Sequence, residues 1–78
     1  MPNLNVMTEH KIKLKKGQPY IELNKVLQIL SIAQTGGHAK IMIRNEEVMV
    51  NGKIETRVRN KLIKNDLITV GDVSIKID

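Results

Sequence analysis

The sequence has no cysteine, phenylalanine or tryptophan, and Tyr20 is its only aromatic residue. Without cysteine there is no disulfide and no thiolate chemistry, which fits a reducing compartment. Without large rings the core has to be aliphatic, and the platforms on which single-stranded bases stack are missing. No apolar run approaches the ~20 residues that span a bilayer. The N-terminus also lacks the pattern of a signal peptide, so we expect a cytoplasmic protein with no membrane partner.

Residues suited to catalysis or metal binding are scarce. His10 and His38 are the only histidines, they lie far apart in the sequence, and no thiolate is present to join them, so we predict no metal site. The adjacent acids Glu46-Glu47 cannot converge on one substrate atom. Gly36-Gly37 lacks the further glycines and the Lys-Ser/Thr of a phosphate loop. We predict no catalytic residue and no cofactor, and therefore a binding module rather than an enzyme.

Positive charge is in excess. The 78 residues carry 13 Lys and Arg against 8 Asp and Glu, a net charge of +5. This balance favours nucleic acid, an acidic protein or an anionic membrane surface as partner. Because stacking platforms are missing, the mode that remains is recognition of folded or duplex RNA by charge and shape. The second helix as a major-groove reader of DNA is possible, but it carries few side chains suited to base edges. The length allows one small domain, and we expect a flexible leader over 1–9 and a single domain over 10–78.

Apolar periodicity predicts two helices. A stripe at i, i+3, i+4 and i+7 indicates a helix over 23–33 with one face in a core. The stripe is formed by Leu23, Val26, Leu27 and Leu30 and is widened by Ile29 and Ala33. Thr35 is placed to cap a second helix over 36–45, its hydroxyl accepting from the amide of residue 37 or 38. The second helix should bury Ala39, Met42 and Ile43.

Short strands surround these helices. Alternation predicts a strand over 10–16, and an extended piece at 20–22 precedes the first helix. Asn51-Gly52 between apolar arms predicts a hairpin, because a type I′ turn needs two residues that tolerate positive φ. Residues 56–61 are polar enough for a loop, 62–63 return to the core, and a second hairpin joins strands over 67–70 and 73–77. The predicted class is α+β, with two packed helices followed by a small, mostly antiparallel sheet of short strands.

The cations gather around the first hairpin and the second helix. Residues 53–64 contain one acidic residue, Glu55, and five basic residues, which are Lys53, Arg57, Arg59, Lys61 and Lys64. Lys40 and Arg44 lie four apart and should share one face of the second helix. Arg57 and Arg59 would share one side of an extended segment, and their guanidinium groups could donate paired hydrogen bonds to neighbouring phosphates. We interpret this region as a functional basic patch, whereas Lys11 to Lys16 fit an ordinary solvated face.

Four motifs in order resemble the S-four (ribosomal protein S-four-like) RNA-binding domain, also called the αL motif. They lie at Ile21–Leu27, Thr35–Lys40, Val48–Lys53 and Asn65–Ile68. Small stand-alone bacterial members are the most similar, and they share the Glu-Thr-Arg-x-Arg-x-Lys pattern of residues 55–61. The resemblance implies non-enzymatic binding of structured RNA, either ribosomal or transfer RNA, through the second helix and the hairpin. The implied contacts are Lys40, Arg44, Asn51, Lys53, Arg57, Arg59 and Lys61, with Lys25, His38 and Lys64 as weaker ones.

The sequence departs from that family pattern at two positions. Gly36 stands where many larger relatives carry a basic residue, and Glu46 stands where glycine usually follows the second helix, so we expect Asn45 to take the left-handed turn. A monomer that meets the ribosomal particle is expected. The alternative is an adaptor that docks on an acidic protein in a ribosomal or replication assembly. A ubiquitin-like carrier is set aside because the chain does not end in Gly-Gly.

Overall fold

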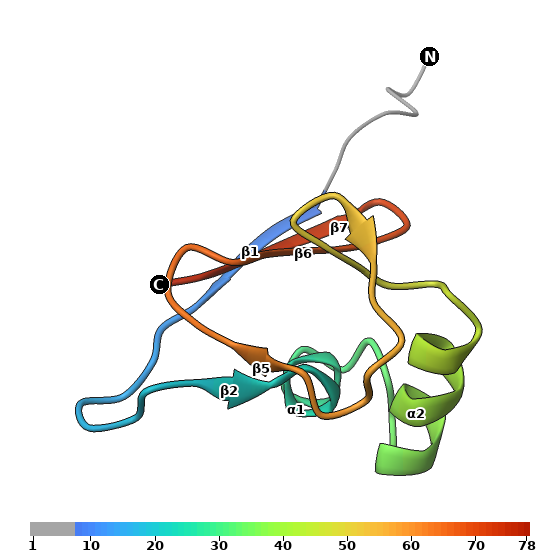
Figure 1. The fold of residues 1–78 in the computed structure, drawn as a ribbon, viewed down its shortest axis with the longest axis horizontal. Helices are drawn as coiled ribbons and strands as arrows, with labels where there is room; N and C mark the ends of the chain where they lie inside the picture. Colours follow the sequence, from blue (N-terminus) through green and yellow to red (C-terminus); the bar gives the residue numbers. More distant parts are fainter. Residues whose placement is uncertain (1–7) are drawn as a thin grey trace.

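The computed structural model describes residues 8–78 as two helices and a set of short strands (Figure 1). The helices are α1 (Leu23–Ile29) and α2 (Gly36–Arg44). The strands are β1 (Thr8–Ile12), β2 (Ile21–Glu22), β3 (Met49–Val50), β4 (Lys53–Ile54), β5 (Lys61–Leu62), β6 (Leu67–Val70) and β7 (Val73–Ile77). The predicted α+β class, with two packed helices and a mostly antiparallel sheet, is confirmed. Neither helix in this part of the chain has the length and apolar content needed to cross a membrane.

Two sheets form the β structure. The larger has the strand order β1-β7-β6-β3-β4, and the smaller pairs β2 with β5. All neighbours are antiparallel except β1 and β7, which run parallel. Figure 1 shows the large sheet on one side, with α1 and the β2-β5 pair facing it and α2 at the end. The core lies between these layers, and its fully buried side chains include Leu27, Ile43, Leu62, Ile68 and Ile75.

The first helix is shorter than the apolar stripe predicts. It ends at Ile29 rather than at residue 33, because Ser31 takes a left-handed conformation with φ 60°. The amides of Ile32 and Ala33 then both donate to the Leu27 carbonyl, at 2.9 and 3.0 Å. Ala33 is still buried as predicted, but Ile29 is 59% exposed. The expectation that Ile29 widens the core stripe is wrong.

The second helix follows the prediction closely. The Thr35 hydroxyl accepts from the His38 amide at 3.0 Å, and Ala39, Met42 and Ile43 are buried. Its C-terminus differs, because Glu46 has φ 64° while Asn45 stays near helical values at φ −82°. The prediction of a left-handed Asn45 is therefore wrong. The Glu47 amide bonds to the Met42 carbonyl and the Glu46 amide to that of Ile43, the pattern of a Schellman turn.

Two strand boundaries also differ from expectation. β1 begins at Thr8 and ends at Ile12, so residues 8 and 9 belong to a strand and not to the expected leader. Residues 1–7 of that leader lie outside the described residues. Leu62 is buried as predicted, but Ile63 is 55% exposed, so only one residue of that pair enters the core. Neighbouring side chains of an extended segment point to opposite faces, so only one of these two consecutive residues can face the core.

The first hairpin has the predicted turn. Asn51 and Gly52 have φ of 52° and 84°, the two positive values that a type I′ turn requires. The Asn51 side chain does more than permit the turn. Its Nδ2 donates to Asp66 Oδ1 at 3.0 Å, and its Oδ1 accepts from the Leu67 amide at 2.9 Å. The second oxygen of Asp66 accepts from the Ile63 amide at 2.8 Å. Asn51 thus fastens the hairpin to the turn before β6.

We predict that Asn51→Ala lowers the free energy of unfolding by about 2 kcal/mol, because it loses two hydrogen bonds and strains a left-handed residue. Asn51→Gly keeps the backbone conformation and should cost about 1 kcal/mol. The exposed hairpin variant Lys53→Ala is the control and should stay within ~0.5 kcal/mol. Urea denaturation measures all three. Equal stability of Asn51→Ala and the control would contradict the role of the side chain.

Candidate nucleic-acid interface

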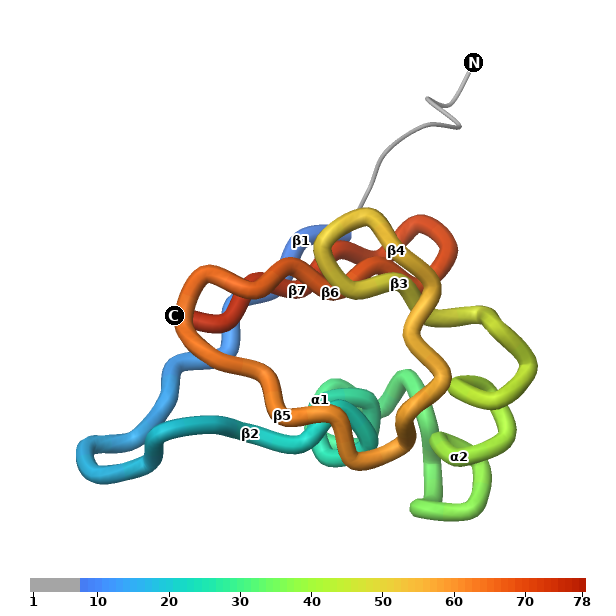
Figure 2. The backbone as a smooth tube through the Cα atoms, viewed as in Figure 1, coloured from blue at the N-terminus to red at the C-terminus, as the bar shows by residue number. Residues whose placement is uncertain are grey.

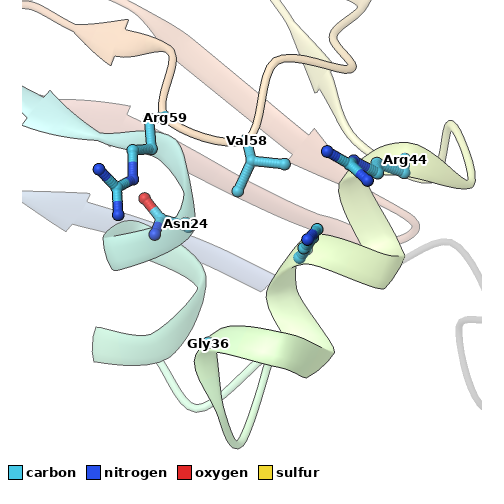
Figure 3. A pocket seen from close by; sticks show the side chains of 6 residues that line it. Asn24, Gly36, Arg44, Val58 and Arg59 are labelled. Atoms are coloured by element: carbon cyan, nitrogen blue, oxygen red, sulfur yellow. The ribbon is translucent and has the colours of Figure 1, made fainter.

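A pocket of about 400 Å³ opens where the segment between β4 and β5 meets the two helices. Figure 2 follows this segment, residues 55–60, from β4 past α2 to β5. The pocket is lined by Asn24 from α1, by Gly36, Lys40 and Arg44 from α2, and by Val58 and Arg59 from the segment. Figure 3 shows that the lining residues come from three separate elements, with Asn24 and Arg59 on one side of Val58 and Arg44 on the other. We call this place the helix–loop pocket.

Backbone hydrogen bonds hold the segment against α1. The Leu23 amide donates to the Asn60 carbonyl at 2.9 Å, and the Asn24 amide donates to the Val58 carbonyl at 3.1 Å. The helix has no side-chain cap, since Glu22 makes no such bond. Loop carbonyls therefore satisfy amides of the first turn, which have no partner inside a helix. This contact fixes where Arg59 stands.

Residues 55–60 contain no strand, as the predicted loop requires, but they turn at 58–59 and are not the extended segment that the alternation of Arg57 and Arg59 predicts. The Asn60 amide donates to the Arg57 carbonyl at 3.1 Å, which closes the chain on itself. Of the two arginines, only Arg59 lines the helix–loop pocket. The prediction of an extended conformation is therefore wrong, although Arg57 and Arg59 still line one common open hollow.

Lys40 and Arg44 lie on one face of α2 as their spacing predicts, and both are exposed and line the pocket. The opposite face of α2 is anchored by Ala39, Met42 and Ile43 in the core, so the two cations are presented on a fixed helix. With Arg59 they make three positive groups from two distant parts of the sequence. Such a cluster suits an anion with several charged oxygens, because guanidinium and ammonium groups donate directly to phosphate.

Asn24 adds an acceptor to this cationic pocket. Its Oδ1 is buried and has no hydrogen-bond partner among the described residues. Asn24 and Arg59 both line the pocket, and Figure 3 draws them on the same side of Val58. A buried oxygen without a partner costs about 1–3 kcal/mol, and a hydroxyl or amino group of a ligand supplies a donor that phosphate lacks. Sequence reasoning missed Asn24, whose only signal was its position off the core stripe of α1.

A second, open hollow adjoins the first. It is lined by Arg57, Arg59, Asn60 and Lys61, so Arg59 belongs to both. The Lys61 ammonium lies 4.8 Å from the centre of the Tyr20 ring, within the range of a cation–π contact. The one aromatic side chain of the sequence is therefore beside a cation of this surface, where it orients Lys61.

Arg57 is engaged by its own neighbour. Its Nε donates to Glu55 Oε2 at 2.9 Å and its second terminal nitrogen donates to Oε1 at 3.0 Å. The Arg57 side chain is 76% exposed, whereas that of Glu55 is 14% exposed. The hydrogen bond from Arg57 lowers the pKa of Glu55, and the carboxylate in turn raises the pKa of Arg57. The Glu55 carboxylate thus compensates part of the positive charge that Arg57 brings to the basic patch.

The remaining predicted contacts lie elsewhere on the surface. Lys53, Lys25 and Lys64 are exposed and line neither hollow. His38 is exposed, and its Nδ1 accepts from the Gln34 amide at 3.2 Å. The side chain of Asn51 already forms hydrogen bonds with Asp66 and with the Leu67 amide. The structure brings together Lys40, Arg44 and Arg59, with Arg57 and Lys61 alongside, and within residues 8–78 it has no group of three acidic or histidine side chains placed to hold a metal.

Comparisons with known proteins agree on one family. The family model described as the S4 domain, the S-four domain above, matches residues 8–78. YbcJ of Escherichia coli (strain K12), provisionally named as an RNA-binding protein, is 30% identical over 59 residues, which is 76% of this chain and 84% of YbcJ. YbcJ of Shigella flexneri, named as an uncharacterized protein, gives the same values.

A solved structure is also similar. It is the solution structure of E. coli YbcJ, described as revealing an αL motif involved in RNA binding. The TM-score is 0.62 at 25% sequence identity, and the match covers 99% of this chain and 94% of that one. The arrangement of two helices and short strands is therefore shared over nearly the full length of both chains.

We predict that the Glu55 carboxyl titrates below its ordinary pKa and that Arg57→Ala moves its pKa back upward. Because the folded pKa is the lower one, the pair stabilises the fold above the unfolded pKa, and this contribution is lost as pH falls through the folded pKa. A carboxyl titration by NMR measures the shift, with Lys53→Ala as the control that leaves it in place. A Glu55 that titrates normally in the wild type would refute the pairing.

Proposed function

This chain belongs to the S4 domain family, and we propose that it binds structured RNA, ribosomal or transfer RNA, without catalysing a reaction. The observation that carries the proposal is the convergence of Lys40, Arg44 and Arg59 in one pocket. These three cations reach it from α2 and from the loop after the hairpin. Packing in the core fixes the helix, and two backbone bonds to α1 fix the loop.

The chemistry of the pocket favours RNA among anionic partners. Three positive groups suit phosphates, and the Asn24 acceptor suits a donor such as the 2′-hydroxyl, which DNA does not have. The similarity to E. coli YbcJ, a protein described as RNA-binding, supports the same partner. Contact with the ribosomal particle, a monomeric state and a cytoplasmic location are parts of this proposal.

The adaptor alternative uses the same charges with a different partner. An acidic protein would also be attracted by Lys40, Arg44 and Arg59, but it would not need an acceptor buried among them. The composition of complexes recovered from cells distinguishes RNA binding from docking on an acidic protein. RNA that crosslinks to the pocket favours the main proposal, whereas a protein complex that survives nuclease treatment favours the adaptor.

We predict that the double variant Lys40→Gln/Arg59→Gln binds transfer RNA at least tenfold more weakly than the wild type at 0.1 M salt. Each lost phosphate contact should also reduce the slope of log affinity against log salt by about 0.7–0.9. Lys15→Gln/Lys16→Gln removes the same charge from an exposed loop and is the matched control. Filter binding at several salt concentrations measures both, and circular dichroism verifies folding. Equal losses in the two folded variants would reject the pocket.

Gly36 offers a test in the opposite direction. Its φ is not left-handed, and an added Cβ would meet only the flexible end of Gln28, at 3.2 Å. We predict that Gly36→Lys, which adds a fourth cation to the lining, tightens RNA binding severalfold. Gly37→Lys is the matched control, because residue 37 does not line the pocket and its Cβ makes only an ordinary contact, at 3.9 Å. An equal gain from both would indicate bulk charge and not the pocket.

A further inference from the structure

A second group of lysines lies on the outer face of the large sheet. Lys11 of β1 and Lys76 of β7 are directly opposite each other in the parallel register, and both are exposed. Ile75 and Ile77 point into the core, so Lys76 between them faces outward. The bonds from Leu14 N to the Asp78 carbonyl and from Asp78 N to the Ile12 carbonyl continue the pairing past β1.

This continued pairing places Lys13 on the same outer face. Ile12 and Leu14 pack against the core and are partly buried, whereas Lys13 between them is exposed. Lys11 and Lys13 are then two residues apart on one face of one strand, about 6.6 Å along it. We call Lys11, Lys13 and Lys76 the sheet lysines.

Nothing within residues 8–78 neutralises the sheet lysines through an ion pair. The one salt bridge in that range joins Arg57 to Glu55. Glu9 lies on the same face, opposite Ser74, and makes no ion pair with Lys11 or Lys76. Like charges directly opposite each other on neighbouring strands are destabilising. The fold therefore carries a repulsion at Lys11 and Lys76 that a bound anion would relieve.

The sheet lysines are remote from the helix–loop pocket. β1 and β7 stand at one edge of the sheet order, and β4, from which the pocket loop departs, is at the other. Four strand spacings of about 4.8 Å separate β1 from β4, roughly 19 Å. In Figures 1 and 2 the sheet and the helices lie on opposite sides of the core. The sheet lysines are thus not an extension of the pocket.

We propose that Lys11, Lys13 and Lys76 form a second phosphate-binding surface, which holds another segment of the same folded RNA. This inference rests on the proposed function. Lys11 and Lys76 line a hollow of about 310 Å³ together with Glu9, His10, Leu67 and Ser74, and Lys13 stands outside this lining. No phenylalanine, tyrosine or tryptophan lines it. Compact ammonium charges on flexible stems fit a phosphate backbone and give no base selection. RNA held at the pocket keeps a second segment at high local concentration, so weak contacts suffice.

Lys76→Gln tests this surface through two opposite effects. Removal of the repulsion should raise the melting temperature, while loss of a phosphate contact should weaken transfer RNA binding about two- to fivefold. The slope of log affinity against log salt should also fall by about 0.7–0.9. Lys11→Gln/Lys76→Gln should weaken binding further but raise the melting temperature no more, because one substitution already removes the pair. A short RNA hairpin that fills only the pocket should bind the wild type and Lys76→Gln equally.

Lys16→Gln is the matched control, since it removes one exposed charge that has no lysine opposite it in the ladder. It should change neither the melting temperature nor the salt slope as Lys76→Gln does. An unchanged salt slope in Lys76→Gln, while Lys40→Gln/Arg59→Gln still binds weakly, overturns the second surface and leaves the proposed function standing. A wild type that binds no RNA overturns the proposed function itself. An acidic protein whose nuclease-resistant binding requires Lys76 would also overturn the RNA assignment.

Discussion

Two backbone hydrogen bonds, from the first amides of α1 to the carbonyls of Val58 and Asn60, connect the halves of the candidate site. They join a helix and a loop that lie more than thirty residues apart in the sequence. β2 and β5 pair immediately beside them, with Ile21 opposite Leu62. The loop satisfies helix amides that would otherwise need a cap, and the helix gives the loop a fixed position. Without this contact Arg59 would have no defined relation to α2.

The same loop gives its two arginines different electrostatic roles. Arg57 is held by Glu55 through two side-chain bonds, so part of its charge is compensated before any partner arrives. Within residues 8–78 Arg59 forms no salt bridge, and it lines the pocket that Asn24 also lines. A neutral neighbour leaves a guanidinium available, whereas a carboxylate competes with phosphate for it. Identical residues two positions apart therefore contribute unequally to an anion site, and only the folded chain distinguishes them.

Local patterns in the sequence predicted much of the fold. Asn51-Gly52 specified its turn, Thr35 its cap, and the apolar spacing the buried face of α2, since each depends on neighbours within a few residues. The parallel pairing of β1 with β7 and the β2-β5 pair were not predicted, because strand partners distant in sequence leave no periodic signal. Of the candidate site, Lys40 and Arg44 followed from helical spacing. The turn that separates Arg57 from Arg59 did not, because it depends on carbonyls bonding to a remote helix, and the roles of all these residues in RNA binding remain predictions.

The pairing of β1 with β7 has a consequence for how the chain folds. It joins Thr8–Ile12 to Val73–Ile77. The two ends of the described chain must therefore come together before β1 can form the edge of the sheet. Such non-local contacts slow folding, whereas the helix pair and both hairpins are made of near neighbours. We expect those local units to form first and the strand at the beginning of the described chain to dock last. An intermediate that lacks this strand would expose β7 as a free edge, the element most prone to pair with another molecule.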